Sequence, residues 1–299
     1  MKSEMKKVAI LLAAYNGERY IAEQLDSILA QTCVSVHIFI SVDKSSDQTL
    51  KILNNLNSEN VTILPYGNRY GNAARNFYRL IQDVDFSDYD FIGFSDQDDR
   101  WKSDKLSRGI DLIEKTDSDA YSSNVTAFWK NGRSKEIIKS QPQKKWDHFF
   151  EAAGPGCTYL FRKENFTQFK EFYKKNQQEI SAITHHDWLI YAWYRASGFT
   201  WLIDENSSMF YRQHGSNELG ANKGIKQKIN RIKRIKNKNF RAEVLKISKL
   251  IHRQKLPTPP GIVESGGGNV AFFLKNFNQT RRKPVEAFFL AFCAVIGIY

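Results

Sequence analysis

The chain has 299 residues, 41% of them hydrophobic and 25% charged, which is typical of a folded protein with a substantial core and excludes an intrinsically disordered chain. The formal charge of +12 comes from one segment, because residues 223–255 hold 13 Lys and Arg against one acid, Glu243, and the rest of the chain balances to zero. Basicity confined to one segment indicates an anionic surface as partner, and three cysteines at unrelated spacings argue against a disulfide framework or a cysteine metal site.

The first half of the chain alternates short apolar runs with helical periodicity. Buried strands are predicted at 8–14, 36–42, 61–64 and 91–94. Helical patterns separate these runs, so we expect an α/β fold with a Rossmann-like, mostly parallel sheet flanked by helices. The first run also resembles the apolar part of a signal peptide. It leads directly into the turn Asn16-Gly17 and an amphipathic helix, so we interpret it as a strand.

The second half is less regular. Helices are expected at 103–115, 146–153, 166–173 and from His185 onward, and strands at 120–129, 158–162, 200–203 and 209–213. Beyond residue 222, isoleucines at 225, 229, 232 and 235 alternate with Lys and Arg, which predicts a basic amphipathic helix. A second such helix is expected through Phe240, Val244, Ile247 and Ile251. We therefore expect two parts, 1–222 and a basic helical appendage, 223–299.

Polar residues follow each of the first four predicted strands: Asn16-Gly17, Asp43, Asn68-Arg69 and Asp96 to Asp99. In a parallel sheet of this kind, ligands bind beyond the carboxyl ends of the strands. One ligand could therefore contact all four segments.

Three carboxylates occur within four positions, at Asp96, Asp98 and Asp99, directly after a buried strand. Such charges repel one another unless a cation lies among them, and oxygen ligands suit Mg²⁺ or Mn²⁺. The alternative is an acidic turn that caps the helix expected near Ser103. The sequence contains neither a G-x-G-x-x-G nor a G-x-x-x-x-G-K-[ST] motif, so a bound phosphate would depend on the metal.

Five motifs in order resemble one known family: Ala14-Tyr15-Asn16-Gly17, Asp43 with Ser45 and Asp47, Ser95 to Trp101, His186-Asp187-Trp188, and Tyr211 to Gly215. The chain resembles glycosyltransferase family 2 from about Lys7 to Asn222, and within it the rhamnosyltransferase-like enzymes of bacterial polysaccharide assembly. The resemblance implies a glycosyltransferase-A fold, a nucleotide-diphosphate sugar donor, Mn²⁺ or Mg²⁺, and inversion at the anomeric carbon.

The resemblance also implies roles for single residues. The expected nucleotide-sugar site consists of Ala14, Tyr15, Asn16, Asp43, Asn68, Arg75, Asp96 and Gln97. Within it, Asp43 would contact the base and Asp96 the ribose. Asp98 would be the main metal ligand, with Asp99 nearby, and His214 would contact the metal or the diphosphate. The family commonly has two aspartates after the second strand, whereas this chain has Val42-Asp43 and then Lys44.

Asp187 matches the catalytic base of the family. An acceptor hydroxyl loses its proton as it attacks, and a carboxylate within hydrogen-bond reach accepts it, so one base and direct displacement predict inversion. A glycosidase would need two flanking carboxylates. The less specific interpretations are a helix cap for Asp187, a surface turn for His214 and a solvated side chain for Arg75. We expect transfer of rhamnose or another hexose; the alternative is an inactive protein that binds nucleic acid or membrane through its basic segment.

The last residues, 287–299, form an apolar tail after Arg281-Arg282-Lys283. Its 13 residues are fewer than the roughly 20 that span a bilayer. Cations beside an apolar segment predict attachment to an anionic membrane surface rather than to nucleic acid, and a contact in a homodimer is the alternative. We expect a cytoplasmic protein attached peripherally to the inner face of the cell membrane, where a glycan or lipid-linked acceptor is presented.

Overall fold

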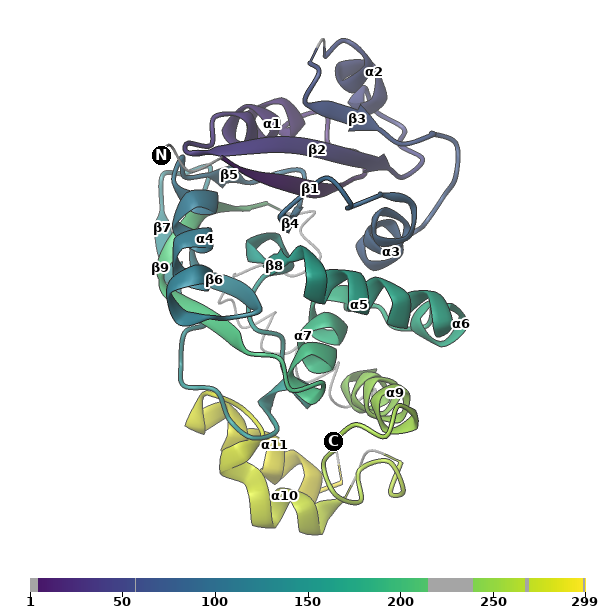
Figure 1. Ribbon diagram of the computed structural model, residues 1–299. Coiled ribbons are helices and arrows are strands. Elements are labelled where there is room, and N and C mark those ends of the chain that lie inside the picture. Colours follow the sequence, from purple (N-terminus) through teal and green to yellow (C-terminus); the bar gives the residue numbers. More distant parts are fainter. Residues whose placement is uncertain (1–4, 57, 215–238, 267–268, 298) are drawn as a thin grey trace. The chain divides into compact units, whose positions relative to one another are not determined.

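The structure is a computed structural model that describes residues 5–56, 58–214, 239–266, 269–297 and 299 (Figure 1). The chain divides into two compact units. Unit 1 contains Met1–Ser140, Gly154–Gln177 and Thr200–Glu218, and unit 2 contains Gln141–Ala153, Gln178–Phe199 and Leu219–Tyr299. Unit 2 thus combines the C-terminal residues with two internal segments, whereas the sequence predicted one boundary at residue 222.

Unit 1 is built on a nine-stranded sheet whose first half is parallel. The order of this half is β3 (Val61–Ile63), β2 (Val34–Val42), β1 (Lys6–Ala14), β4 (Phe91–Ser95), and each neighbouring pair is parallel. β1 lies between β2 and β4 and is buried from Val8 to Ala14, which confirms that this run is a strand. The predicted mostly parallel sheet is confirmed.

The second half of the sheet is mixed. β8 (Leu160–Arg162) pairs antiparallel with β4 and β6 (Ala120–Trp129), and β6 runs parallel to β9 (Trp201–Gln213). The edge strands β5 (Arg100–Trp101) and β7 (Ser134–Ile137) were not predicted.

The prediction of two strands at 200–203 and 209–213 is wrong, because β9 is continuous. The middle of β9 consists of polar residues that pair with β6 across the sheet. Ser208 Oγ lies 2.6 Å from Ser123 Oγ, and Ser207 Oγ lies 2.8 Å from Thr126 Oγ1. These pairs replace the apolar alternation that marks a strand in sequence.

Helices cover both faces of the sheet in unit 1 (Figure 1). On one face, Val8, Ile10 and Leu12 of β1 belong to the same buried cluster as residues of α1 and α4. On the other face, Phe94 stacks on Phe77 of α3 and meets Phe166 of α5 edge-on. The helices and the 3-10 turn are α1 (Ile21–Leu29), α2 (Thr49–Asn54), α3 (Ala73–Asp83), α4 (Lys105–Thr116), η2 (Gly156–Thr158) and α5 (Lys163–Lys175), with α6 (Gln177–Ile180) at the border of unit 2.

Unit 2 is helical in its described residues. It contains η1 (Asp147–Phe149), α7 (His186–Ala196), α9 (Asn239–Arg253), α10 (Val270–Asn276), η3 (Phe277–Gln279) and α11 (Pro284–Val295). Aromatic contacts hold it together: Trp188 stacks on Phe240 with centroids 5.3 Å apart, and Phe273 meets Tyr299 at 4.8 Å. The predicted helix through Phe240 is confirmed as α9, and its apolar side is buried. The helix predicted at 225–235 lies outside the described residues.

Arg281 and Arg282, the cations expected to attach the tail to a membrane, are engaged by groups of unit 2 instead. Arg282 is buried and lies 3.1 Å from Asp147 and 3.2 Å from Glu151. Arg281 donates to the Phe150 carbonyl at 3.1 Å and to Glu286 at 2.8 Å. Both arginines therefore fasten the C-terminal helices within unit 2. Among the described residues, every helix is too short or too polar to cross a membrane.

Candidate functional site

Three parallel strands deliver the predicted site residues to one edge of the sheet. The register places Ala14 opposite Val42 and Leu12 opposite Ser95, so the segments that begin at Tyr15, Asp43 and Asp96 leave the sheet together. This edge is the carboxyl end of the parallel half, where ligands bind in such sheets. The structure thus brings these three predicted segments together.

The side chain of Gln97 holds the loop after β4 to the loop after β1. Tyr15 N donates to Gln97 Oε1 at 2.7 Å, and Gln97 Nε2 donates to the Tyr15 carbonyl at 2.6 Å. This reciprocal pair continues the β1–β4 ladder beyond the last backbone pair. A Cβ on Gly17 would lie 2.3 Å from Gln97 Oε1, so glycine leaves room for the pair. Tyr15 stays exposed beside it.

Asn16 joins the β1 loop to the β2 loop. It has a positive φ of 47°, a conformation that asparagine tolerates better than most residues. Its N–H donates to Ser45 Oγ at 3.0 Å, and its Oδ1 accepts from Ser46 N at 2.8 Å. The backbone around the predicted nucleotide site is therefore fixed by bonds within unit 1.

The Asp43 carboxylate organises the loop after β3. It accepts 2.8 Å hydrogen bonds from the N–H groups of Lys44, Tyr70 and Gly71, and the residue is buried. These bonds leave little capacity for a further donor, so a direct contact of Asp43 with the base stays a prediction. The observed role of Asp43 is to fix the conformation of the loop after β3.

Two more residues of the predicted nucleotide-sugar site, Asn68 and Arg75, are both exposed. No role was predicted from sequence for Arg79, which lies one helical turn after Arg75 on α3. It donates to Ser41 Oγ at 3.0 Å and to the Pro65 carbonyl at 2.6 Å. Helical spacing from Arg75 could have indicated it, because residues four apart lie on one face.

The acidic segment separates into two environments. Asp98 is partly exposed, and its Oδ2 lies 2.7 Å from His214 Nε2. Asp99 is fully buried, and its Oδ1 accepts from Arg212 N at 2.9 Å. One ligand atom each from Asp96, Asp99 and Cys157 lie within 4.8 Å of one another. The structure thus pairs Asp98 with His214 and groups Asp96 with Asp99 and Cys157, and Asp99 is the most deeply buried of the predicted acids.

Burial governs protonation in the deeper part of this cluster. It raises the pKa of Asp99 well above its usual value, and the negative charges of Asp98 and Asp96 raise it further. Burial also raises the pKa of the Cys157 thiol. The Lys105 ammonium, buried 3.7 Å from the centroid of the Trp101 ring, has its pKa lowered by burial to about 7.

The donor atoms fit a divalent cation. Asp98 offers a carboxylate and His214 an imidazole, and these two groups lie at hydrogen-bond distance from each other. The buried Asp99 Oδ2 accepts no hydrogen bond from the described residues. A buried carboxylate oxygen without a partner is costly, and a nearby cation offsets that cost. The carboxylate oxygens of this cluster suit Mg²⁺ or Mn²⁺.

Arg212, which the motif contained but to which no role was assigned, holds the acidic turn. Its Nε donates to the Asp98 carbonyl at 2.8 Å, and its guanidinium lies 4.4 Å from the Tyr20 ring and 4.6 Å from the Phe128 ring. Tyr20 also lies 5.2 Å from the His214 ring. β9 therefore closes the site through Arg212 and His214.

The predicted base, Asp187, lies in unit 2 near the start of α7. It is partly buried, and its Oδ1 accepts from Trp188 N at 2.8 Å. Glu243 of α9, also missed from sequence, accepts from Thr184 N at 2.6 Å and from His185 N at 3.3 Å. The segment that leads to Asp187 is thus anchored within unit 2.

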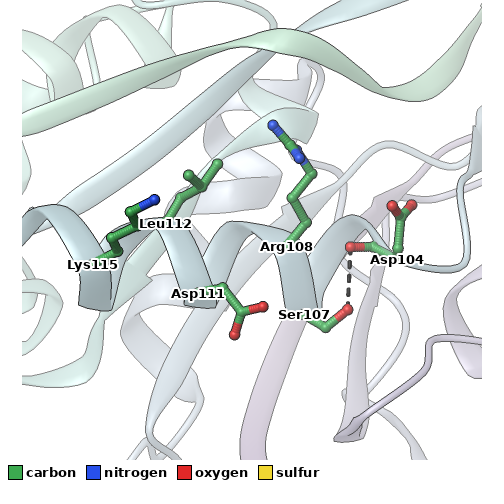
Figure 2. Close-up of a pocket in the computed structure, with 6 residues that line it drawn as sticks. All are labelled: Asp104, Ser107, Arg108, Asp111, Leu112 and Lys115. Atoms are coloured by element: carbon green, nitrogen blue, oxygen red, sulfur yellow. Dashed lines mark hydrogen bonds between the residues drawn. The ribbon is translucent and has the colours of Figure 1, made fainter.

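A shallow pocket of about 400 Å³ lies along α4 and contains none of the predicted residues. Figure 2 shows its lining of Asp104, Ser107, Arg108, Asp111, Leu112 and Lys115. The Arg108 guanidinium already donates to both Asp204 oxygens, at 2.8 and 3.1 Å. Because Arg108 is already bonded to Asp204, this pocket is a weaker candidate for a functional site than the acidic segment.

A family model described as glycosyl transferase family 2 matches residues 9–202. The dTDP-rhamnosyl transferase RfbG of Shigella flexneri is 40% identical over 291 residues, which cover 96% of this chain and 100% of that protein. A UDP-Glc:alpha-D-GlcNAc-diphosphoundecaprenol beta-1,3-glucosyltransferase of Escherichia coli, WfaP, is 31% identical over 110 residues, 37% of this chain and 42% of that protein.

Two solved structures share the fold. Staphylococcus aureus TarS in complex with UDP-GlcNAc has a TM-score of 0.55 at 15% identity and covers 97% of this chain and 81% of its own. The mannosyltransferase PcManGT of Pyrobaculum calidifontis, in complex with GDP-Man and Mn²⁺, has a TM-score of 0.53 at 14% identity and covers 99% of this chain and 75% of its own. The predicted glycosyltransferase-A fold is confirmed.

Proposed function

The chain belongs to glycosyltransferase family 2, and from this premise we propose that it transfers rhamnose from a dTDP-linked donor to a hydroxyl group during bacterial polysaccharide synthesis. That it is an enzyme acting on a nucleotide sugar follows from the family. The proposal of rhamnose and dTDP is supported by the 40% identity with a dTDP-rhamnosyl transferase along its whole length. This similarity favours an enzyme over an inactive surface-binding protein.

The observation that carries the mechanism is the excess of acid at the sheet edge, where Asp98 Oδ2 and His214 Nε2 lie 2.7 Å apart. We propose that these two residues hold Mn²⁺ or Mg²⁺, with Asp99 adding its charge from behind. When bound, the ion stabilises negative charge on a diphosphate as a Lewis acid. Arg212 keeps the Asp98 backbone in place through its 2.8 Å bond.

The donor would lie along the edge formed by Ala14, Tyr15, Asn16 and Asp96. Gln97 and Asn16 fix the backbone there, so that little reorganisation accompanies binding. The exposed Tyr15 ring is suited to pack on the nucleoside. Asn68 and Arg75, both exposed, are proposed to contact the donor from the loop after β3 and from α3.

Asp187 is proposed as the base. Its carboxylate takes the proton from the acceptor hydroxyl while the acceptor oxygen bonds to the anomeric carbon. The bond from that carbon to the diphosphate oxygen breaks, its electron pair leaves with the nucleotide diphosphate, and the configuration inverts. The Trp188 N–H bond orients the carboxylate at the start of α7. The acceptor is proposed to be a glycan or lipid-linked sugar at the inner face of the cell membrane.

We expect Asp187→Asn to lower kcat by about a thousandfold, because the amide accepts no proton. Donor binding should stay within about twofold of the wild type, measured by the rise in Tm that dTDP-rhamnose and Mn²⁺ produce together. The matched control is Glu179→Gln, an exposed acid of unit 2. Near-normal turnover by Asp187→Asn would place the base elsewhere, and stabilisation by UDP-sugars alone would refute the dTDP donor.

A further inference from the structure

α11 is apolar on both of its faces. Its inner face consists of smaller side chains that are buried in unit 2: Ala287, Leu290, Ala291, Cys293 and Ala294. Its outer face exposes larger ones at helical spacing, and we call them the α11 stripe: Val285, Phe288, Phe289, Phe292, Val295 and Ile296. A helix on the surface of a soluble protein normally turns a polar face outward. The α11 stripe therefore lacks the polar character that water favours.

This exposure is concentrated in one part of the chain. Of the fourteen large hydrophobic residues exposed in the described residues, nine lie between Val270 and Ile296. Val285 is 80% exposed and Phe288 65%, and Leu274 on the neighbouring α10 is 61% exposed. Single exposed hydrophobic residues are ordinary, but a continuous set of this size marks a surface that binds something apolar.

The charges around the stripe favour one occupant. Between residues 270 and 299 the sequence has one acid, Glu286, which Arg281 neutralises at 2.8 Å. Lys275 of α10 is exposed, and Lys283, directly before α11, is partly exposed, so the net charge of this segment is positive. A second copy of the chain would bring two such positive segments together, whereas an anionic bilayer complements both the apolar stripe and the lysines.

The size of the helix restricts how it meets a bilayer. α11 has 12 residues, about 18 Å of helix, and a hydrocarbon core is about 30 Å thick. We propose that α11 lies in the plane of an anionic phospholipid membrane, with the α11 stripe inserted at the boundary between headgroups and acyl chains. The inference rests on the membrane attachment proposed above and names its surface. The surface keeps the apolar tail expected from sequence but not its arginine neighbours, because Arg281 and Arg282 are engaged within unit 2.

The test is flotation of the full-length protein with phosphatidylcholine vesicles that contain phosphatidylglycerol. The double variant Phe288→Ser/Phe292→Ser should bind at least tenfold more weakly, because two apolar rings are lost from the inserted surface. Lys275→Glu/Lys283→Glu should lose about tenfold at low salt and less at high salt. The matched control is Met5→Ser/Ile138→Ser, which removes two exposed hydrophobic residues of unit 1 and should change nothing.

A second variant tests the proposal through a gain of signal rather than through a loss of vesicle binding. Phe288→Trp should gain fluorescence that lipids brominated near the headgroup quench, whereas the added fluorescence of Ile138→Trp should not be quenched. The surface is refuted if the serine variant floats like the wild type or if the brominated lipids leave the fluorescence of Phe288→Trp unaffected. It is also refuted if the wild type is a dimer that the serine variant dissociates while vesicle binding persists. Transfer to a soluble acceptor is measured separately, so a failure here leaves the proposed reaction standing.

Discussion

The two units each contain a cluster of buried charge, and the clusters differ in balance. In unit 2, Asp147 accepts from Arg282 at 3.1 Å and from the Tyr191 hydroxyl at 3.0 Å, and Glu151 lies 3.2 Å from Arg282. In unit 1, ligand atoms of Asp96, Asp99 and Cys157 lie within 4.8 Å of one another, the charge of Asp98 also acts on Asp99, and the buried Asp99 Oδ2 accepts no hydrogen bond from the described residues. Asp99 is thus as deeply buried as Asp147, but Asp147 lies among arginines, whereas Asp99 has the partly exposed acids Asp96 and Asp98 as neighbours.

The pKa values move in opposite directions for this reason. Burial alone would raise the pKa of Asp147, but His148, Arg195 and Arg282 hold it below its usual value. The pKa of Asp99 is raised by burial and raised again by its acidic neighbours. A balanced cluster supports the fold by itself, whereas an acid excess costs stability unless a cation is supplied. The comparison teaches that an imbalance of charge, rather than burial, distinguishes the proposed binding site from the structural cluster of unit 2.

The largest expected effect falls on activity in unit 1. Asp98→Asn should lower kcat/KM by at least about a thousandfold, because roughly 4 kcal/mol of charge stabilisation at the diphosphate disappears. Its Tm without metal should be equal to that of the wild type or higher, since one repelling charge is gone. Asp111→Asn, an exposed acid on α4, is the matched control and should keep full activity. Loss of stability in Asp98→Asn would break the contrast between the units.

In unit 2 the effect should fall on stability instead. Arg282→Met should reduce the free energy of unfolding by roughly 3–5 kcal/mol, because it leaves Glu151 buried without its cation and Asp147 with Arg195 alone. Urea denaturation measures it. Adding Asp147→Asn to Arg282→Met should restore part of the loss, since the uncompensated charge is then removed. A change below about 1 kcal/mol would mean that the network is not what fastens the C-terminal helices.

The smallest effect concerns pH. Hydrogen bonds from His185 and Thr184 outweigh the effect of burial and lower the pKa of Glu243 from 4.5 to about 2. Its contribution is therefore complete above pH 4.5 and is lost as the pH falls toward 2. Glu243→Gln should be less stable than the wild type by about 2 kcal/mol at about pH 7, and the two should converge near pH 2. A difference that is constant with pH would refute this role.

Much of the fold followed from the sequence, because apolar runs ending in polar residues locate β1, β2 and β4 and the site at their ends. The mixed half was harder. The middle of β9 is polar, and its strand character depends on partners such as Ser123 and Thr126, which are about eighty residues away in the chain. Pairing at that separation leaves no local pattern.

The sequence indicated which residues follow the strands at the sheet edge, but it did not indicate how deeply each of them is buried. Composition does not distinguish Asp98, which meets His214, from Asp99, which points to the backbone of β9. Arg282 resembled a surface cation because its partners, Asp147 and Glu151, are more than a hundred residues away. Arg212 stood in a motif but showed its role only when β9 placed it behind the Asp98 carbonyl.

Calorimetric titration of dTDP into the protein, with and without Mn²⁺, tests the central claim most directly. The account predicts that Mn²⁺ strengthens dTDP binding at least tenfold in the wild type. In Asp98→Asn and in His214→Ala, Mn²⁺ should leave the affinity for dTDP unchanged. Equal affinity with and without Mn²⁺ in the wild type, or full enhancement by Mn²⁺ in Asp98→Asn, would contradict it.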